Sequence, residues 1–132
     1  MARFWTFILV ALTFTACFSK TNTVKAITPL ETQGMLRNDF AVVLDVREEG
    51  EVKEGMAQGA LWIAKSKIDA DAPEWKSFLE KHPKHKQIIV YCRSGNRSGK
   101  VADLLVKQGY QVSNMGTFSS WQKAGLPVTI PH

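Results

Sequence analysis

The 132-residue sequence has little of what marks a metal site, a disulfide framework or a nucleic-acid-binding surface. It has two cysteines, Cys17 and Cys92, and neither belongs to a Cys-x-x-Cys or Cys/His pattern that would bind zinc. Its net charge of +5 comes from scattered lysines and arginines, with no basic run interleaved with aromatics, so we expect no nucleic-acid partner. The length excludes tandem domains, and 45% hydrophobic with 22% charged residues is typical of a chain that folds by itself.

The sequence also lacks an apolar run long enough for an ordinary membrane span, which needs roughly 20 residues. Residues 4–18 carry no charge and follow Arg3, an arrangement typical of a secretory signal. We therefore divide the chain into a signal peptide or lipoprotein signal with a short polar tether, residues 1–26, and one domain, residues 27–132. This division predicts export, and the expected compartment is a bacterial periplasm.

Two routes of signal processing remain open. The stretch Phe14-Thr15-Ala16-Cys17 resembles a bacterial lipobox, in which Cys17 would be lipidated and would anchor the protein to a membrane. The stretch Val24-Lys25-Ala26 has instead the small-residue spacing that ordinary signal peptidase reads. On either route Cys92 is the only free thiol of the mature chain. Because an unpaired thiol is a liability in an oxidising compartment, its presence indicates a reactive role.

Apolar patterning along the remaining chain predicts strands that alternate with helices. Strands are expected at residues 40–44, 60–63, 87–91 and 110–113. Helices are expected from Thr28-Pro29, from Ala72-Pro73, after Ser98 as far as Gly109, and over 119–125, with a short surface helix or turn within 48–54. This order predicts an α/β fold with a central, mostly parallel sheet and helices on both faces. A functional site is then expected at the carboxyl ends of the strands.

The residues after the third expected strand form the strongest candidate site. Cys92 ends that strand, and a helix is expected after the loop Arg93, Ser94, Gly95, Asn96, Arg97 and Ser98. Successive backbone N–H groups in such a loop, together with the helix dipole, stabilise an anion. A helix N-terminus and neighbouring arginines both lower the pKa of a thiol. The sequence therefore indicates an activated cysteine nucleophile, and the alternative is an inert buried cysteine that ends a strand.

This strand and loop resemble the active site of the rhodanese-like domain family, whose sulfurtransferases carry sulfane sulfur as a cysteine persulfide. The resemblance spans residues 27–128. It includes Leu44-Asp45-Val46-Arg47 with Glu51, Gly59-Ala60, and the C-terminal stretches 116–121 and 123–127. The sequence departs from the family at Met56, where many members have His, and at Thr117, which replaces a frequent second glycine.

The resemblance implies a thiosulfate sulfurtransferase of the rhodanese type with Cys92 as the catalytic residue. It implies that the residues from Arg93 to Ser98 bind the substrate, and that no metal or organic cofactor takes part. The expected donor is a small sulfur anion such as thiosulfate, and the acceptor is cyanide, a thiol or a protein. We expect a monomer that meets a membrane only through the possible lipid anchor.

Asp45 and Arg47 end another strand, and we expect them to lie beside the site as supporting residues. They form either an ion pair that positions the loop through Arg97 or, in the case of Arg47, a direct contact with the donor. Two other functions remain open. One is a sulfur-relay or partner-binding module with little thiosulfate turnover. The other is a cysteine phosphatase or arsenate reductase, which the short loop disfavours because Arg97 lies five rather than six positions after Cys92.

Overall fold

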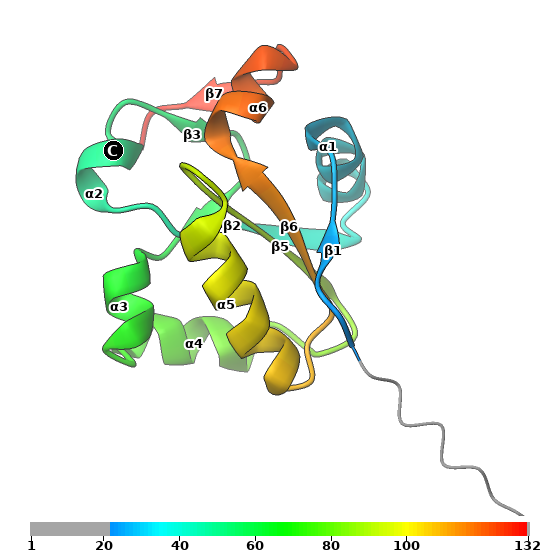
Figure 1. Ribbon diagram of the computed structural model, residues 1–132, viewed down its shortest axis with the longest axis vertical. Helices are drawn as coiled ribbons and strands as arrows, with labels where there is room; N and C mark the ends of the chain where they lie inside the picture. Colours follow the sequence, from blue (N-terminus) through cyan, green and yellow to red (C-terminus); the bar gives the residue numbers. More distant parts are fainter. Residues whose placement is uncertain (1–21, 132) are drawn as a thin grey trace, which may run out of the picture.

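The computed structural model describes residues 22–131, so the N-terminal apolar run, Cys17 and the last residue lie outside the described residues. Within this range, the central sheet has five strands: Lys25–Ala26 (β1), Ala41–Asp45 (β2), Leu61–Trp62 (β4), Gln87–Cys92 (β5) and Val112–Thr117 (β6). They lie in the order β1-β6-β5-β2-β4, and every neighbouring pair is parallel (Figure 1). A separate antiparallel pair joins Met56–Ala57 (β3) to Val128–Thr129 (β7).

Helices cover both faces of the sheet, as the alternating pattern predicts. In the described part of the chain they are Pro29–Arg37 (α1), Glu49–Val52 (α2), Lys65–Asp69 (α3), Pro73–Lys81 (α4), Asn96–Lys107 (α5) and Phe118–Lys123 (α6). Helices α3, α4 and α5 pack on one face, and α1 and α6 pack on the other (Figure 1). The α/β architecture with a central parallel sheet is therefore confirmed.

The inner strands are buried on both faces, which explains their uninterrupted apolar sequences. All five residues of β2 are buried, and so are the last five of β5. Successive side chains alternate between two core clusters, because side chains in a strand point to opposite faces. Leu44 packs in the cluster that contains Trp75 of α4, whereas its neighbour Val43 packs in the cluster that contains Trp121 of α6.

The folded region begins earlier than the boundary expected at residue 27. Lys25 and Ala26, which we expected in the tether, form β1 and pair with Ser113 and Asn114 of β6. Upstream of this strand, the Asn22 side chain donates a hydrogen bond to the carbonyl oxygen of Gly109 at 3.3 Å. Both residues of β1 have exposed side chains, so no apolar pattern announces the strand. Its position depends on tertiary pairing with β6.

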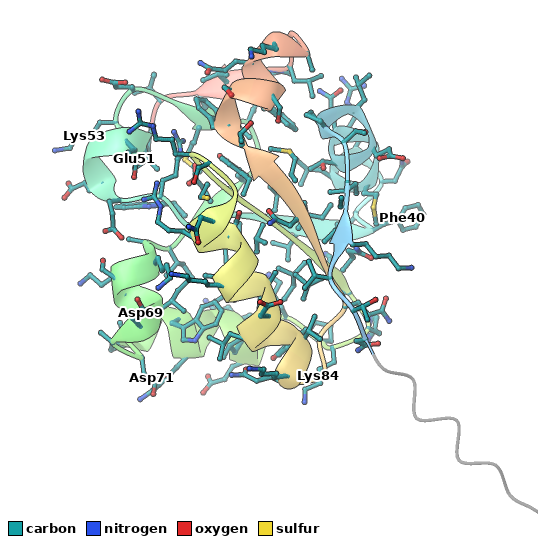
Figure 2. The ribbon with its side chains drawn as sticks, viewed as in Figure 1. Phe40, Glu51, Lys53, Asp69, Asp71 and Lys84 are labelled. Carbon is teal, nitrogen blue, oxygen red and sulfur yellow. The ribbon has the colours of Figure 1, made fainter. Side chains whose placement is uncertain are left out.

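Some side chains expected in the core lie at the surface. Phe40 precedes β2 and is 67% exposed, and its ring points away from the sheet (Figure 2). Leu30, an apolar residue in the first turn of α1, is 65% exposed. Trp62 is also exposed, because β4 is an edge strand, and its indole nitrogen donates a hydrogen bond to the Arg47 carbonyl at 2.7 Å. These corrections concern the edges of the sheet and leave the predicted centre intact.

Parallel pairing brings the functional segments together at one end of the sheet. Strands β2 and β5 are neighbours, with Asp45 opposite Tyr91, so the residues that follow each strand emerge side by side. Strand β6 flanks β5 on its other side, with Thr117 opposite Cys92. Among residues 22–131, we find no helix whose length and hydropathy would let it cross a membrane.

Candidate active site

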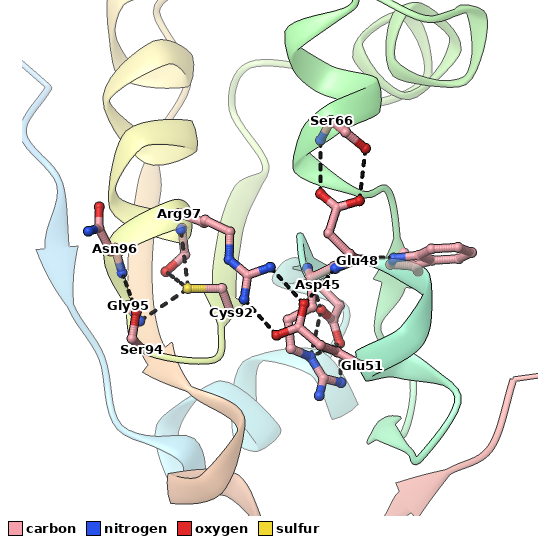
Figure 3. Close-up of polar contacts among 12 residues, drawn as sticks. Asp45, Glu48, Glu51, Ser66, Cys92, Ser94, Gly95, Asn96 and Arg97 are labelled. Carbon is pink, nitrogen blue, oxygen red and sulfur yellow. Dashed lines mark hydrogen bonds and ion pairs between the residues drawn. The ribbon is translucent and has the colours of Figure 1, made fainter.

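The sulfur of Cys92 lies at the centre of a loop whose polar groups point at it. Cys92 is the last residue of β5 and is fully buried. Its Sγ accepts hydrogen bonds from the backbone N–H of Gly95 at 3.1 Å and of Ser98 at 3.4 Å (Figure 3). The Ser98 hydroxyl lies 3.3 Å from the same sulfur. A sulfur surrounded by hydrogen-bond donors is suited to carry negative charge.

Gly95 gives the loop its shape. Its φ of +89° lies in the left-handed region, which glycine adopts without strain. A Cβ at this position would make only an ordinary van der Waals contact, 3.5 Å from the Cα of Gly116 on β6, so the positive φ is what favours glycine. Gly95 is the N-cap of α5, so the helix begins directly after the turn and presents its first N–H groups toward the loop. This local conformation creates the anion-binding geometry that the sequence predicts.

The surroundings of Cys92 favour its ionised form. Burial opposes ionisation and is the largest single influence, but hydrogen bonds from Ser98, Gly95 and Ser94 together hold the pKa of the thiol below its ordinary value. We expected the arginines of the loop to contribute to this shift. Within the described residues, the hydrogen bonds to the sulfur come from neutral groups. Arg97 interacts with the sulfur through its charge only, since the charge of Cys92 is one of the smaller influences that raise the pKa of Arg97.

Arg97 forms an ion pair outside the loop, with a partner that differs from the expected one. We expected Arg97 to connect the loop to Asp45 and Arg47, but its guanidinium instead binds Glu51 of α2. Both contacts of this bidentate pair are 2.7 Å long (Figure 3). The hydrogen bonds from Arg97 lower the pKa of Glu51 to about 2, against a smaller opposing effect of burial. Because Glu51 also accepts a hydrogen bond from Glu48 N at 2.9 Å, the pair fixes α2 against the Cys92 loop.

Asp45 and Arg47 form a second ion pair, which is buried. The Arg47 side chain contacts the Asp45 carboxylate at 2.7 and 3.0 Å and donates a hydrogen bond to the Gly55 carbonyl at 2.7 Å. Its guanidinium carbon lies 4.1 Å from the ring centroid of Phe118. The side chain of Arg47 is 6% exposed and that of Asp45 is fully buried. These contacts favour the supporting role that we expected, since most of the guanidinium is already engaged.

A pocket of about 520 Å³ opens beside the loop. Arg93, which follows Cys92 directly, is exposed and lines this pocket. The charges of Arg47 and Glu51 in the wall are each neutralised by a partner. Among residues 22–131, neither Arg93 nor Glu54 belongs to an ion pair with a distance below 4 Å. The full lining is Arg47, Gly50, Glu51, Glu54, Arg93, Phe118, Ser119 and Gln122. The pocket is therefore large enough for a small anionic donor and carries a cation at its border.

Two other loop residues, which the family resemblance assigns to substrate binding, lie at the surface of the loop. Ser94 and Asn96 are exposed, and their side chains make no hydrogen bond to the sulfur within the described residues. Ser94 acts through its backbone N–H, which helps to lower the Cys92 pKa, and its hydroxyl accepts a hydrogen bond from Asn96 N at 3.4 Å. The structure thus brings the whole loop from Cys92 to Ser98 together, with its backbone facing the sulfur.

Asn114 of β6 is a site residue that the sequence analysis missed. Its side-chain oxygen accepts hydrogen bonds from the Ser98 hydroxyl at 2.8 Å and from Gly116 N at 2.9 Å. Its side-chain nitrogen donates to the Gly95 carbonyl at 3.3 Å. The only signal in the sequence is a polar residue within a strand that lies next to the catalytic one. Asn114 therefore connects the sheet to the middle of the loop at Gly95 and to its end at Ser98.

A buried thiol at the carboxyl end of a parallel sheet, enclosed by a tight loop of backbone amides, is an arrangement suited to stabilise an anion beside a cysteine. The family model of the rhodanese-like domain matches residues 28–124, and the chain belongs to this family. This membership agrees with the resemblance carried by the Cys92 loop.

Known relatives connect this family membership to sulfur transfer. The chain is 31% identical to a sulfurtransferase of Allochromatium vinosum over 101 residues. This alignment covers 75% of this chain and 88% of the relative. The chain is 33% identical to the thiosulfate sulfurtransferase GlpE of Actinobacillus succinogenes over 104 residues. This second alignment covers 77% of this chain and 87% of the relative. A crystal structure of a rhodanese-related protein from Thermoplasma volcanium superposes with a TM-score of 0.67 at 26% identity, over 81% of this chain and 99% of that one. The chain is thus similar to sulfurtransferases over most of its length.

Proposed function

We propose that the protein is a thiosulfate sulfurtransferase in which Cys92 carries the transferred sulfur as a persulfide. One observation carries this proposal: the Cys92 sulfur accepts hydrogen bonds from the backbone of Gly95 and Ser98 beside a pocket bordered by Arg93. This arrangement stabilises a thiolate nucleophile and gives an anionic donor a place to bind. The similarity to relatives named as sulfurtransferases supports the same chemistry.

The proposed reaction has two half-reactions. In the first, the Cys92 thiolate attacks the outer sulfur of thiosulfate, a new sulfur–sulfur bond forms, and sulfite leaves with the electron pair of the bond that breaks. The negative charge of the enzyme then lies on the outer sulfur of the persulfide. In the second, a nucleophilic acceptor such as cyanide or a thiol attacks this outer sulfur, and Cys92 leaves as a thiolate. Charge and atoms balance in each step without a cofactor.

Each part of the site has a proposed role in this cycle. The backbone amides from Arg93 to Ser98 hold the anion of the thiolate and then of the persulfide. The exposed guanidinium of Arg93 draws the anionic donor toward the pocket. The buried pair of Asp45 and Arg47 supports the wall of the pocket without touching the reacting sulfur.

The test is formation of thiocyanate from thiosulfate and cyanide by the full chain. We expect Cys92→Ser to reduce the rate at least about a thousandfold, because the persulfide cannot form on a hydroxyl. The matched control is Cys17→Ser, which removes the other cysteine and should retain the wild-type rate. Wild-type activity in the Cys92→Ser protein would refute the proposal.

A second candidate is a sulfur-relay module that receives or delivers sulfur through a partner protein. The observation that favours it is that Cys92 is fully buried and does not line the pocket, so access to the sulfur would depend on a partner that moves the loop. A relay would be loaded with sulfur but would turn over slowly with cyanide. Single-turnover loading, followed by the rate of sulfur removal by cyanide, distinguishes a relay from a turnover enzyme.

We also propose that the protein is exported and is processed upstream of Asn22. The uncharged residues 4–18 after Arg3 support export. Strand β1 supports the upstream position, because cleavage after Ala26 would remove both of its residues from the sheet. This reasoning favours lipidation at Cys17, which lies outside the described residues. The intact mass of the mature protein from a bacterial host tests it: a lipid mass lost in Cys17→Ser supports lipidation, and a mature chain that begins at Ile27 contradicts it.

A further inference from the structure

The hydroxyl group of Ser98 has two possible acceptors but only one proton. It lies 2.8 Å from the side-chain oxygen of Asn114 and 3.3 Å from the Cys92 sulfur. The Asn114 amide is fixed in orientation by two neighbours: Gly116 N can only donate to it, and the Gly95 carbonyl can only accept from it. The atom that faces Ser98 is therefore the Asn114 oxygen, which can only accept. Asn114 and the sulfur thus compete for a single proton.

The charge on the sulfur decides which acceptor the hydroxyl serves. An uncharged sulfur is a weak acceptor, so the Ser98 hydroxyl donates to Asn114, and a Cys92 thiol can direct its own proton at the Ser98 oxygen. A thiolate has no proton to donate and attracts donors strongly. The hydroxyl then turns toward the sulfur. This turn leaves no orphaned group, because the Asn114 oxygen keeps its hydrogen bond from Gly116 N at 2.9 Å.

We propose that Asn114 is a positioning residue that holds the Ser98 hydroxyl proton while Sγ of Cys92 is uncharged and releases it when Sγ becomes a thiolate. The inference rests on the proposed function only for the persulfide state. When Cys92 takes up sulfur, the negative charge moves to the outer sulfur and the hydroxyl returns to Asn114. When an acceptor removes that sulfur, the thiolate forms again as the leaving group and the hydroxyl turns back. Asn114 thereby allows the site to match both charge states of Sγ.

Other charged groups near Cys92 make no hydrogen bond to the Ser98 hydroxyl, although the charge of Arg97 also favours the thiolate. The Glu51 carboxylate on α2 binds Arg97 of α5, and the pair of Asp45 and Arg47 follows β2. Arg93 lies in the exposed part of the loop, and β6 carries no charged residue between Val112 and Thr117. Substitutions at Ser98 and Asn114 therefore alter the proton competition while leaving these charges in place.

The test is the pH dependence of Cys92 alkylation by iodoacetamide in the full chain, measured by mass spectrometry of the peptide that contains Cys92. Asn114→Leu removes the competing acceptor. At pH values below the midpoint of the alkylation curve, it should raise the alkylation rate about fivefold. Asn114→Asp provides a stronger, charged acceptor and should slow it by a similar factor. Ser98→Ala removes the shared donor and should slow alkylation about tenfold.

The double variant distinguishes proton competition from a general loosening of the loop. With Ser98→Ala in place, Asn114→Leu should no longer speed alkylation, because no shared proton remains. Asn114→Ala replaces the leucine variant if thermal unfolding shows that the latter does not fold. Ser113→Ala is the matched control: it removes a buried hydroxyl on the same strand that bonds Gln87, and it should leave the midpoint unchanged.

The outcomes are decisive without any sulfur donor, so failure of this inference is separate from failure of the proposed function. The exchange is supported if Asn114→Leu raises the alkylation rate, Asn114→Asp lowers it, and Asn114→Leu has no effect when Ser98→Ala is also present. The exchange is overturned if both Asn114 substitutions change the alkylation rate in the same direction. It is also overturned if Asn114→Leu still raises the rate in the double variant. A protein that takes no sulfur from thiosulfate would still give one of these results.

Discussion

The contacts on the inner side of the Cys92 loop differ in charge from those on its outer side. On the inner side, backbone amides and the hydroxyl of Ser98 contact the sulfur, and Asn114 contacts the loop from β6. On the outer side, two ion pairs surround the loop, one between Glu51 and Arg97 and one that is buried beneath the pocket. Neutral dipoles thus contact the sulfur, while Arg47 and Arg97 are paired with carboxylates and Arg93 lines the pocket without an ion-pair partner among residues 22–131.

This difference indicates a division of labour between chemistry and architecture. A guanidinium in direct contact with the thiolate would stabilise it strongly and would hinder the later departure of charge to the outer sulfur. Neutral donors stabilise the anion more moderately and can be exchanged. The Glu51–Arg97 pair instead fixes the segment after β2 against the loop after β5, and the Asp45–Arg47 pair lies within the segment that ends β2. We therefore expect inner substitutions to change reactivity and outer substitutions to change stability.

The largest expected effect on the outer side follows from removal of the Asp45 carboxylate. Asp45→Ala leaves the Arg47 guanidinium buried without its anion, which should lower the free energy of unfolding by about 3–5 kcal/mol. Urea denaturation measures the loss. The matched control is Asp69→Ala, which breaks the exposed ion pair with Lys65 and should cost less than about 1 kcal/mol. Equal losses in the two variants would mean that burial of the first pair has no energetic consequence.

A smaller effect on stability is expected for Glu51→Gln. The folded-state pKa of Glu51 is about 2, below its ordinary value of 4.5, so the pair with Arg97 stabilises the fold above pH 4.5 and loses this effect as the pH falls toward 2. The variant should cost about 1 kcal/mol at neutral pH and should show a shallower loss of stability between these two pH values.

Denaturation midpoints measured at several pH values check the Glu51 prediction. Glu49→Gln is the control, because Glu49 lies on the same helix but pairs with Lys53 at the exposed surface at 3.6 Å. This control should retain the wild-type acid profile. If Glu51→Gln leaves the pH dependence of stability unchanged, the pair of Glu51 and Arg97 does not stabilise the fold. The proposed stabilising role of the outer side would then be wrong.

The smallest effect is expected for Arg93→Ala, which removes an exposed cation at the pocket border. The KM for thiosulfate should rise about fivefold, and the rise should diminish at high salt, because an exposed charge is screened. The alkylation profile of Cys92 and the stability should not change. Lys107→Ala at the far end of α5 is the control for net charge, and an equal rise in its KM would assign the effect to general electrostatics.

Much of this architecture could be predicted from local sequence. The helix at Thr28-Pro29 has the expected capping box, in which Glu31 N donates to the Thr28 hydroxyl at 3.2 Å and Thr28 N donates to the Glu31 carboxylate at 2.9 Å. The continuous apolar runs of β2 and β5 predict strands buried on both faces. The loop after Cys92 follows from a strand end, a glycine and a helix start in close succession.

The parts that could not be predicted depend on tertiary contact. Strands β1, β3 and β7 have two residues each, which is too short for any hydrophobic period. Strand β6 runs from Val112 to Thr117, whereas the sequence predicts a strand over 110–113. The prediction ends too early because Asn114 and Gly116 are residue types that are depleted in strands. For the same reason, the sequence gives no sign that Asn114 is a site residue. Its role becomes visible only when β6 lies beside the catalytic strand.

The partner of Arg97 illustrates the same limit. Glu51 lies 46 positions away in the sequence, among three further glutamates, Glu48, Glu49 and Glu54. The family resemblance includes Glu51, but no pattern in the sequence shows that its carboxylate is the one that binds Arg97. The conformation of the short helix α2 determines which glutamate binds Arg97, because the capping contact within this helix orients Glu51 toward α5.

The central claim, that Cys92 carries sulfur within a loop of neutral donors, is tested most directly by the intact mass of the reduced full chain. The mass is measured before thiosulfate, after thiosulfate, and after subsequent cyanide, with Cys92→Ser in parallel. The account predicts that the wild type gains the mass of one sulfur atom on Cys92, loses it to cyanide, and that the variant gains nothing. A free Cys92 thiol that takes up no sulfur, or an equal gain in the Cys92→Ser chain, would contradict the account.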